Sequence, residues 1–181
     1  MPTKTKIILT TVAVAVVVVA FILSTQLSGP TSATSNAPQS ASSGGLASSA
    51  SKVDLAVEQA APEQPDGYLI TLRVDDGWHV NANPASMNFL IPTTVTTALD
   101  GQPVEIPTIY PQGEDIGIEL EGDTIEVYSD GATIRLQPND PARQQMKGAS
   151  QLDIQVRVQS CDDTGTCLAP ANLVRTVSLS Q

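Results

Sequence analysis

The chain has 181 residues, with 19 acidic and 9 basic side chains and a formal net charge of −10. So few cations cannot form the basic face of a typical nucleic-acid-binding protein, and no nucleic-acid partner is expected. With two cysteines and a single histidine, His79, the chain lacks the residues for a cysteine-rich zinc site or a disulfide-rich scaffold. No metal or organic cofactor is expected.

The first segment, residues 1–27, contains an apolar run from Ile7 to Leu23 that follows Lys4 and Lys6. As a helix this run rises about 25 Å at ~1.5 Å per residue, close to the ~30 Å thickness of a membrane core. We expect an uncleaved signal-anchor helix that attaches the protein to the membrane and leaves the remainder exported. A cleaved signal peptide, which would release a soluble protein, is the alternative.

Residues 28–52 are rich in Ser, Ala, Thr, Gly and Pro, a composition that predicts a flexible linker. Residues 53–181 carry all 19 acidic side chains and 6 basic ones, so this part alone has a net charge of −13. Its length is ordinary for one domain with one core.

Alternating apolar and polar residues indicate that residues 53–181 form an all-β domain. The pattern predicts strands at residues 68–74, 124–128, 132–136 and 152–158. Asp-Gly pairs typical of tight turns occur at residues 66–67, 76–77, 100–101 and 130–131. Only residues 140–148 suggest a helix, with Asp140 as its cap and Pro141 at its first position. Short strands and frequent turns favour an immunoglobulin-like β-sandwich.

Trp78 is the only tryptophan and is expected to anchor the core after a turn. His79 beside it would point the other way, as a surface residue or one with its hydrogen bonds satisfied. A soft-metal pair of His79 with Met87 is conceivable, but nothing in the spacing enforces it.

Cys161 and Cys167 follow the strand at residues 152–158 and precede a second apolar stretch at residues 173–179. This order predicts a hairpin whose loop is closed by a disulfide, because facing residues of antiparallel strands lie close enough for one. A purely structural disulfide is one interpretation. Closing so short a loop contributes only ~2.4 kcal/mol in the chain-entropy model, which favours a second interpretation, exchange with another protein.

The residues around the cysteines predict which partner attacks first. Asp162 and Asp163 place negative charge beside Cys161, which disfavours its thiolate, and no Lys, Arg or His is near in the sequence. We therefore expect a disulfide that is attacked by a low-pKa thiolate of a partner, or a dithiol activated within a complex.

The segment from Val158 to Pro170 resembles the active-site hairpin of the N-terminal periplasmic domain of the DsbD family of thiol:disulfide interchange proteins. The shared features are a C-x5-C pair after a strand, a Gly before the second Cys and a Pro soon after it. The stretches from Asp76 to Val80, Ile91 to Thr93 and Gly122 to Leu136 are also similar, so the likeness covers most of residues 55–181.

The resemblance implies an immunoglobulin-like fold and thiol–disulfide interchange in the periplasm, where the domain would be held at the inner membrane. It implies a thioredoxin-like electron donor and, as acceptors, periplasmic oxidoreductases or other proteins that bear disulfides. Cys167 would form the mixed disulfides and Cys161 would resolve them. The alternative is a non-catalytic exported β-sandwich that binds another protein and contains a structural disulfide.

Overall fold

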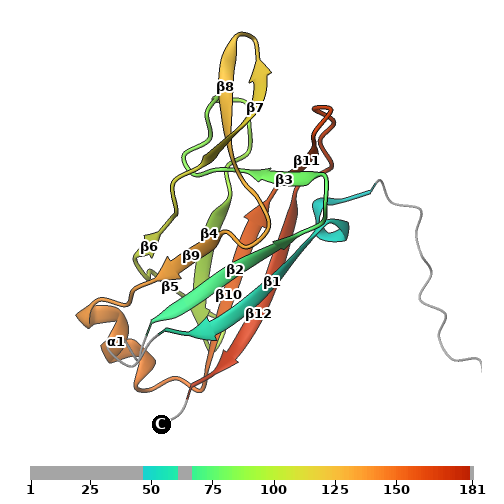
Figure 1. The fold of residues 1–181 in the computed structure, drawn as a ribbon. Coiled ribbons are helices and arrows are strands. Elements are labelled where there is room, and N and C mark those ends of the chain that lie inside the picture. The colour runs from blue at the N-terminus through green and yellow to red at the C-terminus, as the bar shows by residue number, and fades with distance from the viewer. Residues whose placement is uncertain (1–46, 61–66, 180–181) are drawn as a thin grey trace, which may run out of the picture. The chain divides into compact units, whose positions relative to one another are not determined.

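A computed structural model describes residues 47–60 and 67–179 (Figure 1). The strands of this part form three four-stranded antiparallel sheets, which confirms the all-β prediction. The expected anchor segment, residues 1–27, and most of the expected linker lie outside the described residues. Among the helices of the described part, none is long and apolar enough to cross a membrane.

The first sheet has the order β1-β2-β9-β6. Its strands are β1 (Val53–Gln59), β2 (Tyr68–Val74), β9 (Thr133–Leu136) and β6 (Thr108–Ile109). The predicted strands at residues 68–74 and 132–136 are thereby confirmed as β2 and, one residue shorter, β9. The Asp130-Gly131 turn precedes β9, with Gly131 at a φ of 85° as a tight turn requires.

The second sheet has the order β12-β10-β4-β5. Its strands are β12 (Ala171–Ser178), β10 (Gln151–Val158), β4 (Thr94–Leu99) and β5 (Gln102–Val104). The predicted strand at residues 152–158 is the central strand β10, and it pairs with β12 from Gln151 opposite Ser178 to Val158 opposite Ala171. The expected hairpin between these two strands is therefore present.

The third sheet lies at one end of the domain and has the order β11-β3-β8-β7 (Figure 1). Its strands are β11 (Ser160–Asp162), β3 (Trp78–Asn81), β8 (Asp123–Tyr128) and β7 (Glu114–Leu120). The predicted strand at residues 124–128 is most of β8. This sheet contains β11, which carries Cys161, and its partner strand β3, so it positions the candidate site.

The core lies between the first two sheets, because one cluster of buried apolar side chains draws on both. On β10, Leu152, Ile154, Val156 and Val158 are all fully buried, whereas the residues between them are not. Ile70 and Leu72 of β2 are buried just as completely. Each such side chain contributes about 1.5–3 kcal/mol through removal from water, so this period-two pattern fixes which face of each sheet points inward.

The helix α1 (Asp140–Met146) confirms the one helix expected from the sequence, but its cap is one residue earlier. The side chain of Asn139, not Asp140, accepts the hydrogen bond from the Ala142 amide at 3.0 Å. Asp140 is instead the first helical residue, where its negative carboxylate interacts favourably with the positive end of the helix dipole. Asn and Asp are equally good caps, so the sequence could not separate the two positions.

Candidate disulfide site

The two cysteines lie on a hairpin tip that leaves the second sheet and joins the third. After β10 ends at Val158, the chain passes into β11, which pairs with β3 instead of continuing along β12. Cys161 is directly opposite His79, and Asp162 is opposite Trp78. The tip of the predicted hairpin is therefore held by a strand that lies some 80 residues earlier in the chain.

Cys161 and Cys167 form a disulfide with a Cα–Cα distance of 3.9 Å, and they pair as an isolated antiparallel bridge. This confirms that the two sulfurs close the loop. Their surroundings differ sharply, since Cys161 is 3% exposed whereas Cys167 is an exposed residue. A protein that approaches from solvent therefore meets Cys167, while Cys161 is buried.

The carboxylate of Asp162 organises the loop between the cysteines. Its Oδ1 accepts hydrogen bonds from the Thr164 amide at 3.0 Å, the Thr164 hydroxyl at 2.7 Å and the Thr166 amide at 2.9 Å. These hydrogen bonds hold the pKa of the Asp162 carboxyl below its usual range, and the bond from the Thr164 hydroxyl has the largest effect. The sequence presented Asp162 only as a charge beside Cys161, whereas the structure shows that it ties the loop together.

Ser49 joins the two arms at the base of the hairpin. It belongs to the 3-10 turn η1 (Ser49–Ser51), within the stretch expected to be linker, and its side chain is fully buried. Its hydroxyl accepts a hydrogen bond from the Ser160 amide at 2.8 Å and donates one to the Ala169 carbonyl at 2.9 Å. The Ser49 amide donates to the same carbonyl at 2.8 Å. The chain just before β1 is thus bonded to the residue that precedes Cys161.

His79 is the functional candidate that sequence reasoning missed. No Lys, Arg or His lies near the cysteines in the sequence, but the fold places His79 opposite Cys161, where it is only 4% exposed. Its Nδ1 has no hydrogen-bond partner and lies 3.6 Å from Oδ1 of Asp163. Burial lowers the pKa of His79, and Asp163 and Asp162 partly oppose this shift. The expectation of a surface or fully satisfied histidine is wrong.

Trp78 packs against the core as expected, although it is only half-buried. The Nζ of Lys52 lies 5.3 Å from the centre of its ring and 3.1 Å from the Asp75 carboxylate. A cation over an aromatic face is attracted by the ring quadrupole. This contact attaches the start of β1 to the start of β3, next to the cysteine hairpin.

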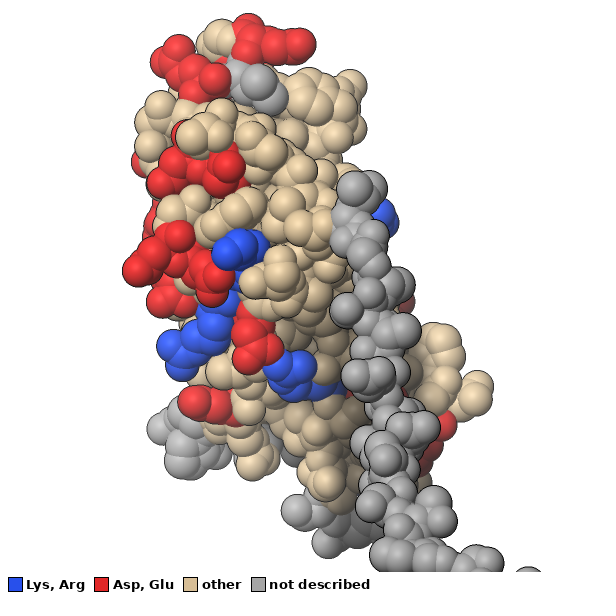
Figure 2. Space-filling view, turned by 90° about the vertical axis from the view of Figure 1, so that its right-hand side faces the viewer, with Lys and Arg blue, Asp and Glu red and all other residues tan. Residues whose placement is uncertain are grey.

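Acidic side chains dominate the end of the domain that carries the site. Figure 2 shows Asp and Glu at the end where the β7–β8 hairpin lies, and the basic side chains of that view lie lower, intermixed with further Asp and Glu. The β7–β8 hairpin itself exposes Glu114, Asp115, Glu119, Asp123 and Glu126. A strongly acidic partner would be repelled from this end.

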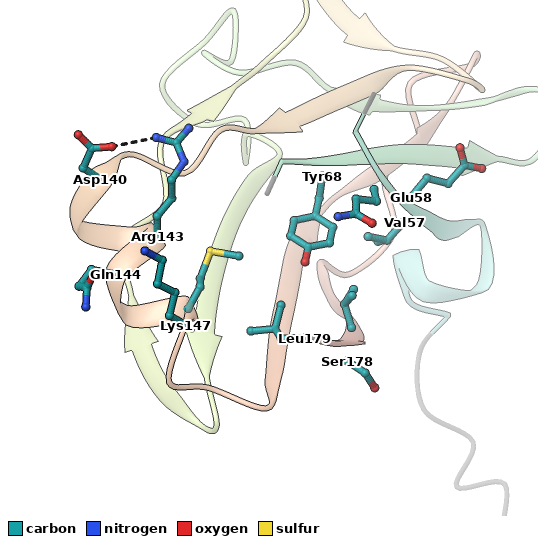
Figure 3. A pocket seen from close by; sticks show the side chains of 12 residues that line it. Val57, Glu58, Tyr68, Asp140, Arg143, Gln144, Lys147, Ser178 and Leu179 are labelled. Carbon is teal, nitrogen blue, oxygen red and sulfur yellow. Dashed lines mark hydrogen bonds and ion pairs between the residues drawn. The ribbon is translucent and has the colours of Figure 1, made fainter. Parts of the chain in front are cut away.

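A cleft lies at the other end of the domain, between α1 and the ends of β1, β2 and β12 (Figure 3). Figure 3 shows the Tyr68 ring and Leu179 on one side and the helix side chains Arg143 and Lys147 on the other. No cysteine or histidine lines it, so it does not share the chemistry of the disulfide. The described residues also contain no cluster of three or more His, Cys, Asp or Glu side chains that could hold a metal ion.

Comparison with known proteins gives one family match. The family model for the N-terminal part of the thiol:disulfide interchange protein DsbD matches residues 51–179. Among solved structures, the crystal structure of the Neisseria meningitidis DsbD N-terminal domain in the reduced form is similar at a TM-score of 0.47 and 19% identity. That match covers 72% of this chain and 86% of the other. A search of curated proteins finds no match.

An all-β domain with a disulfide on a short hairpin, in which one cysteine is exposed and the other buried, fits thiol–disulfide exchange. The family match spans well over half of the chain and includes both cysteines. The chain belongs to the DsbD N-terminal domain family, as the hairpin motif predicted. Membership in this family implies interaction with thioredoxin-like redox partners.

Proposed function

We propose that the domain, an immunoglobulin-like sandwich, passes reducing equivalents in the periplasm from a thioredoxin-like donor to exported proteins that bear disulfides. The observation that carries this proposal is the unequal burial of the two bonded cysteines. An exchange disulfide needs one sulfur that partners reach and a second that remains close by to release them.

Reduction of the domain begins when a donor thiolate attacks the Sγ of Cys167. The Cys161–Cys167 bond breaks, Cys161 leaves as a thiolate that takes up a proton, and a mixed disulfide joins Cys167 to the donor. The second donor thiol, as its thiolate, then attacks the donor sulfur of the mixed disulfide and releases Cys167. Two electrons and two protons reach the domain, and the donor is left with a disulfide.

The domain passes its reducing equivalents to the acceptor through the same sulfur, that of Cys167. The Cys167 thiolate attacks the acceptor disulfide and forms a mixed disulfide, and one acceptor sulfur leaves as a thiolate. The Cys161 thiolate then attacks the Sγ of Cys167, which restores the Cys161–Cys167 bond and releases the second acceptor sulfur. The cysteines carry the electrons in every step, so the reaction needs no further redox group.

We further propose that residues 1–27 hold the domain at the inner membrane and that the part of residues 28–52 before the η1 turn tethers it, with signal-peptide cleavage as the alternative. The composition of these two segments supports this arrangement. Cell fractionation tests it, because an anchored protein remains with the membrane after high-salt washing, whereas a cleaved one appears in the soluble periplasmic fraction at a lower mass.

Trapping with Cys161→Ser tests the exchange function. This variant keeps the exposed nucleophile but cannot resolve a mixed disulfide, so covalent adducts through Cys167 should accumulate in cells and contain thioredoxin-like proteins. Cys167→Ser is the matched control and should accumulate few adducts, because its remaining thiol is buried. A bond that resists glutathione, with no adducts of Cys161→Ser, would instead support a binding module with a structural disulfide.

A further inference from the structure

His79 and Cys161 lie in a shared buried environment. They are direct partners in the β3–β11 register, and they are 4% and 3% exposed. Directly opposed residues of antiparallel strands project to the same face with Cβ atoms about 4.5–5.5 Å apart. An imidazole and a sulfur in this relation lie within reach of each other.

The Nδ1 of His79 is buried without a hydrogen-bond partner, an arrangement that native structures rarely tolerate without a functional reason. The nearest acidic oxygen is Oδ1 of Asp163 at 3.6 Å. A carboxylate beside one ring nitrogen favours the tautomer with the proton on that nitrogen, which leaves the other nitrogen, Nε2, as an acceptor. Such contacts are often long in a resting site and shorten during reaction.

The resolving step of exchange needs a base at this place. A buried thiol ionises poorly, yet only a thiolate attacks a disulfide. Because burial keeps the pKa of His79 below that of a free imidazole, the ring is neutral at neutral pH and is able to accept a proton.

The charged groups that act on His79 come from the cysteine loop, namely Asp163 and Asp162. On its other side, β8 places Tyr128 opposite Val80, and burial raises the pKa of Tyr128, so that phenol stays neutral. Both acidic neighbours stabilise the imidazolium that forms when the ring accepts a proton.

We propose that His79, oriented by Asp163, is the proton acceptor that turns Cys161 into the resolving nucleophile. In the mixed disulfide, the Cys161 thiol proton passes to Nε2 of His79 as its sulfur bonds to Cys167. The bond between Cys167 and the partner breaks, and the partner leaves as a thiolate that the imidazolium can reprotonate. This assignment rests on the proposed function, since it concerns the second half of the exchange.

The resolving step can be isolated in the purified domain with a chromogenic disulfide, dithiobis(nitrobenzoate). Attack by Cys167 forms a mixed disulfide with thionitrobenzoate, and attack by Cys161 then releases a second thionitrobenzoate at a rate independent of reagent concentration. We expect His79→Gln to slow this second phase about 10²-fold at neutral pH, the usual contribution of one acid–base group. The wild-type rate should also rise through the His79 titration, and this rise should be absent from the variant.

Two further variants separate chemistry from folding. Asp163→Asn, in an exposed loop, should slow the second phase and move its pH dependence to lower pH, since the imidazolium loses a stabilising charge. Asp76→Asn, an exposed acid in the turn before β3, should behave as wild type. If His79→Gln fails to fold, the second-phase kinetics of Asp163→Asn decide whether the role assigned to His79 holds.

The assignment would be overturned if the second phase of His79→Gln kept the wild-type rate and pH profile. If His79→Gln does not fold, the same result for Asp163→Asn would overturn it. Because the reagent replaces the cellular partner, these kinetics are independent of whether Cys161→Ser traps proteins in cells. If Cys161→Ser traps no proteins in cells but the second phase still depends on His79, the cellular function is rejected and the role of His79 is retained.

Discussion

The hydroxyl of Ser49 accepts a hydrogen bond from the amide of Ser160 at 2.8 Å, across 111 residues of chain. Ser160 immediately precedes the buried cysteine, and both serines are fully buried. The bond therefore connects the position of Cys161 to the segment that leads into the domain from its N-terminal side.

Removal of the Ser49 hydroxyl should destabilise the domain. Ser49→Ala leaves the buried Ser160 amide without an acceptor, which costs about 1–3 kcal/mol of unfolding free energy, measured by denaturant unfolding. Ser51→Ala is the matched control, because the Ser51 hydroxyl bonds only locally to the Ser48 carbonyl at an exposed position. Its effect should stay within about 0.5 kcal/mol. Equal losses in the two variants would contradict the role assigned to Ser49.

The two reduced thiols should differ in reactivity toward iodoacetamide. Cys167 is exposed and Cys161 is 3% exposed, so brief alkylation of the reduced domain should label Cys167 almost exclusively. Mass spectrometry of peptides cleaved between the two cysteines measures the ratio. Comparable labelling of both sulfurs in the folded domain would show that the hairpin opens on reduction. Unfolded protein, in which the labelling should be equal, serves as the reference.

Asp162 should control the redox equilibrium of the disulfide. In Asp162→Ala the loop loses an acceptor that holds Thr164 and Thr166, so the two reduced thiols are less well juxtaposed. The disulfide should become easier to reduce by about tenfold in its equilibrium with glutathione, which corresponds to ~30 mV for two electrons. Asp162→Asn, which keeps an acceptor oxygen at this position, should lie closer to wild type. An unchanged equilibrium in Asp162→Ala would show that the loop is ordered by the backbone alone.

Stability should fall below neutral pH because of His79, the only histidine in the chain. Burial lowers the pKa of His79 in the folded state below the ordinary value of 6.5, so the unfolded chain binds its proton first as the pH falls. The free energy of unfolding is therefore constant above the unfolded pKa. It decreases from there down to the folded pKa by at most about 1.4 kcal/mol per pH unit.

Urea unfolding at several pH values tests this linkage. The loss should begin near pH 6.5, the ordinary imidazole value, and His79→Gln should remove it. The carboxyls of Asp100 and Asp162, whose pKa values are lowered, titrate in a more acidic range and do not obscure the window. Persistence of the same loss in His79→Gln would assign it to another group.

Local patterns sufficed for β2 and β10, one strand from each of the two sheets that enclose the core. The alternation of apolar and polar residues in β2 and β10 could be recognised because one face of each strand is buried. It was less useful for β4, where threonines occupy both faces, and for β7, whose pairing with β8 shifts register between Asp115 and Glu119. β4 carries no clean period of two, and the short alternation of Ile116, Ile118 and Leu120 in β7 was not recognised as a strand, so neither was predicted.

The cysteine pair could be found from spacing, but its surroundings could not. Cys161 and Cys167 are close in sequence, and a hairpin brings them together. His79 and Ser49 reach the same hairpin only through pairings that span some 80 and 111 residues. Such contacts depend on how the sheets assemble, and no periodicity within a single segment encodes them.

The burial of Cys161 also has a kinetic consequence. With only Cys167 of the pair exposed, the donor and the acceptor of the proposed exchange must bond to the same sulfur, so they cannot be joined to the domain at the same time. Each turnover then consists of two separate half-reactions. The domain is reduced by the donor in the first and oxidised by the acceptor in the second. Steady-state rates should accordingly give the parallel double-reciprocal lines of a ping-pong enzyme.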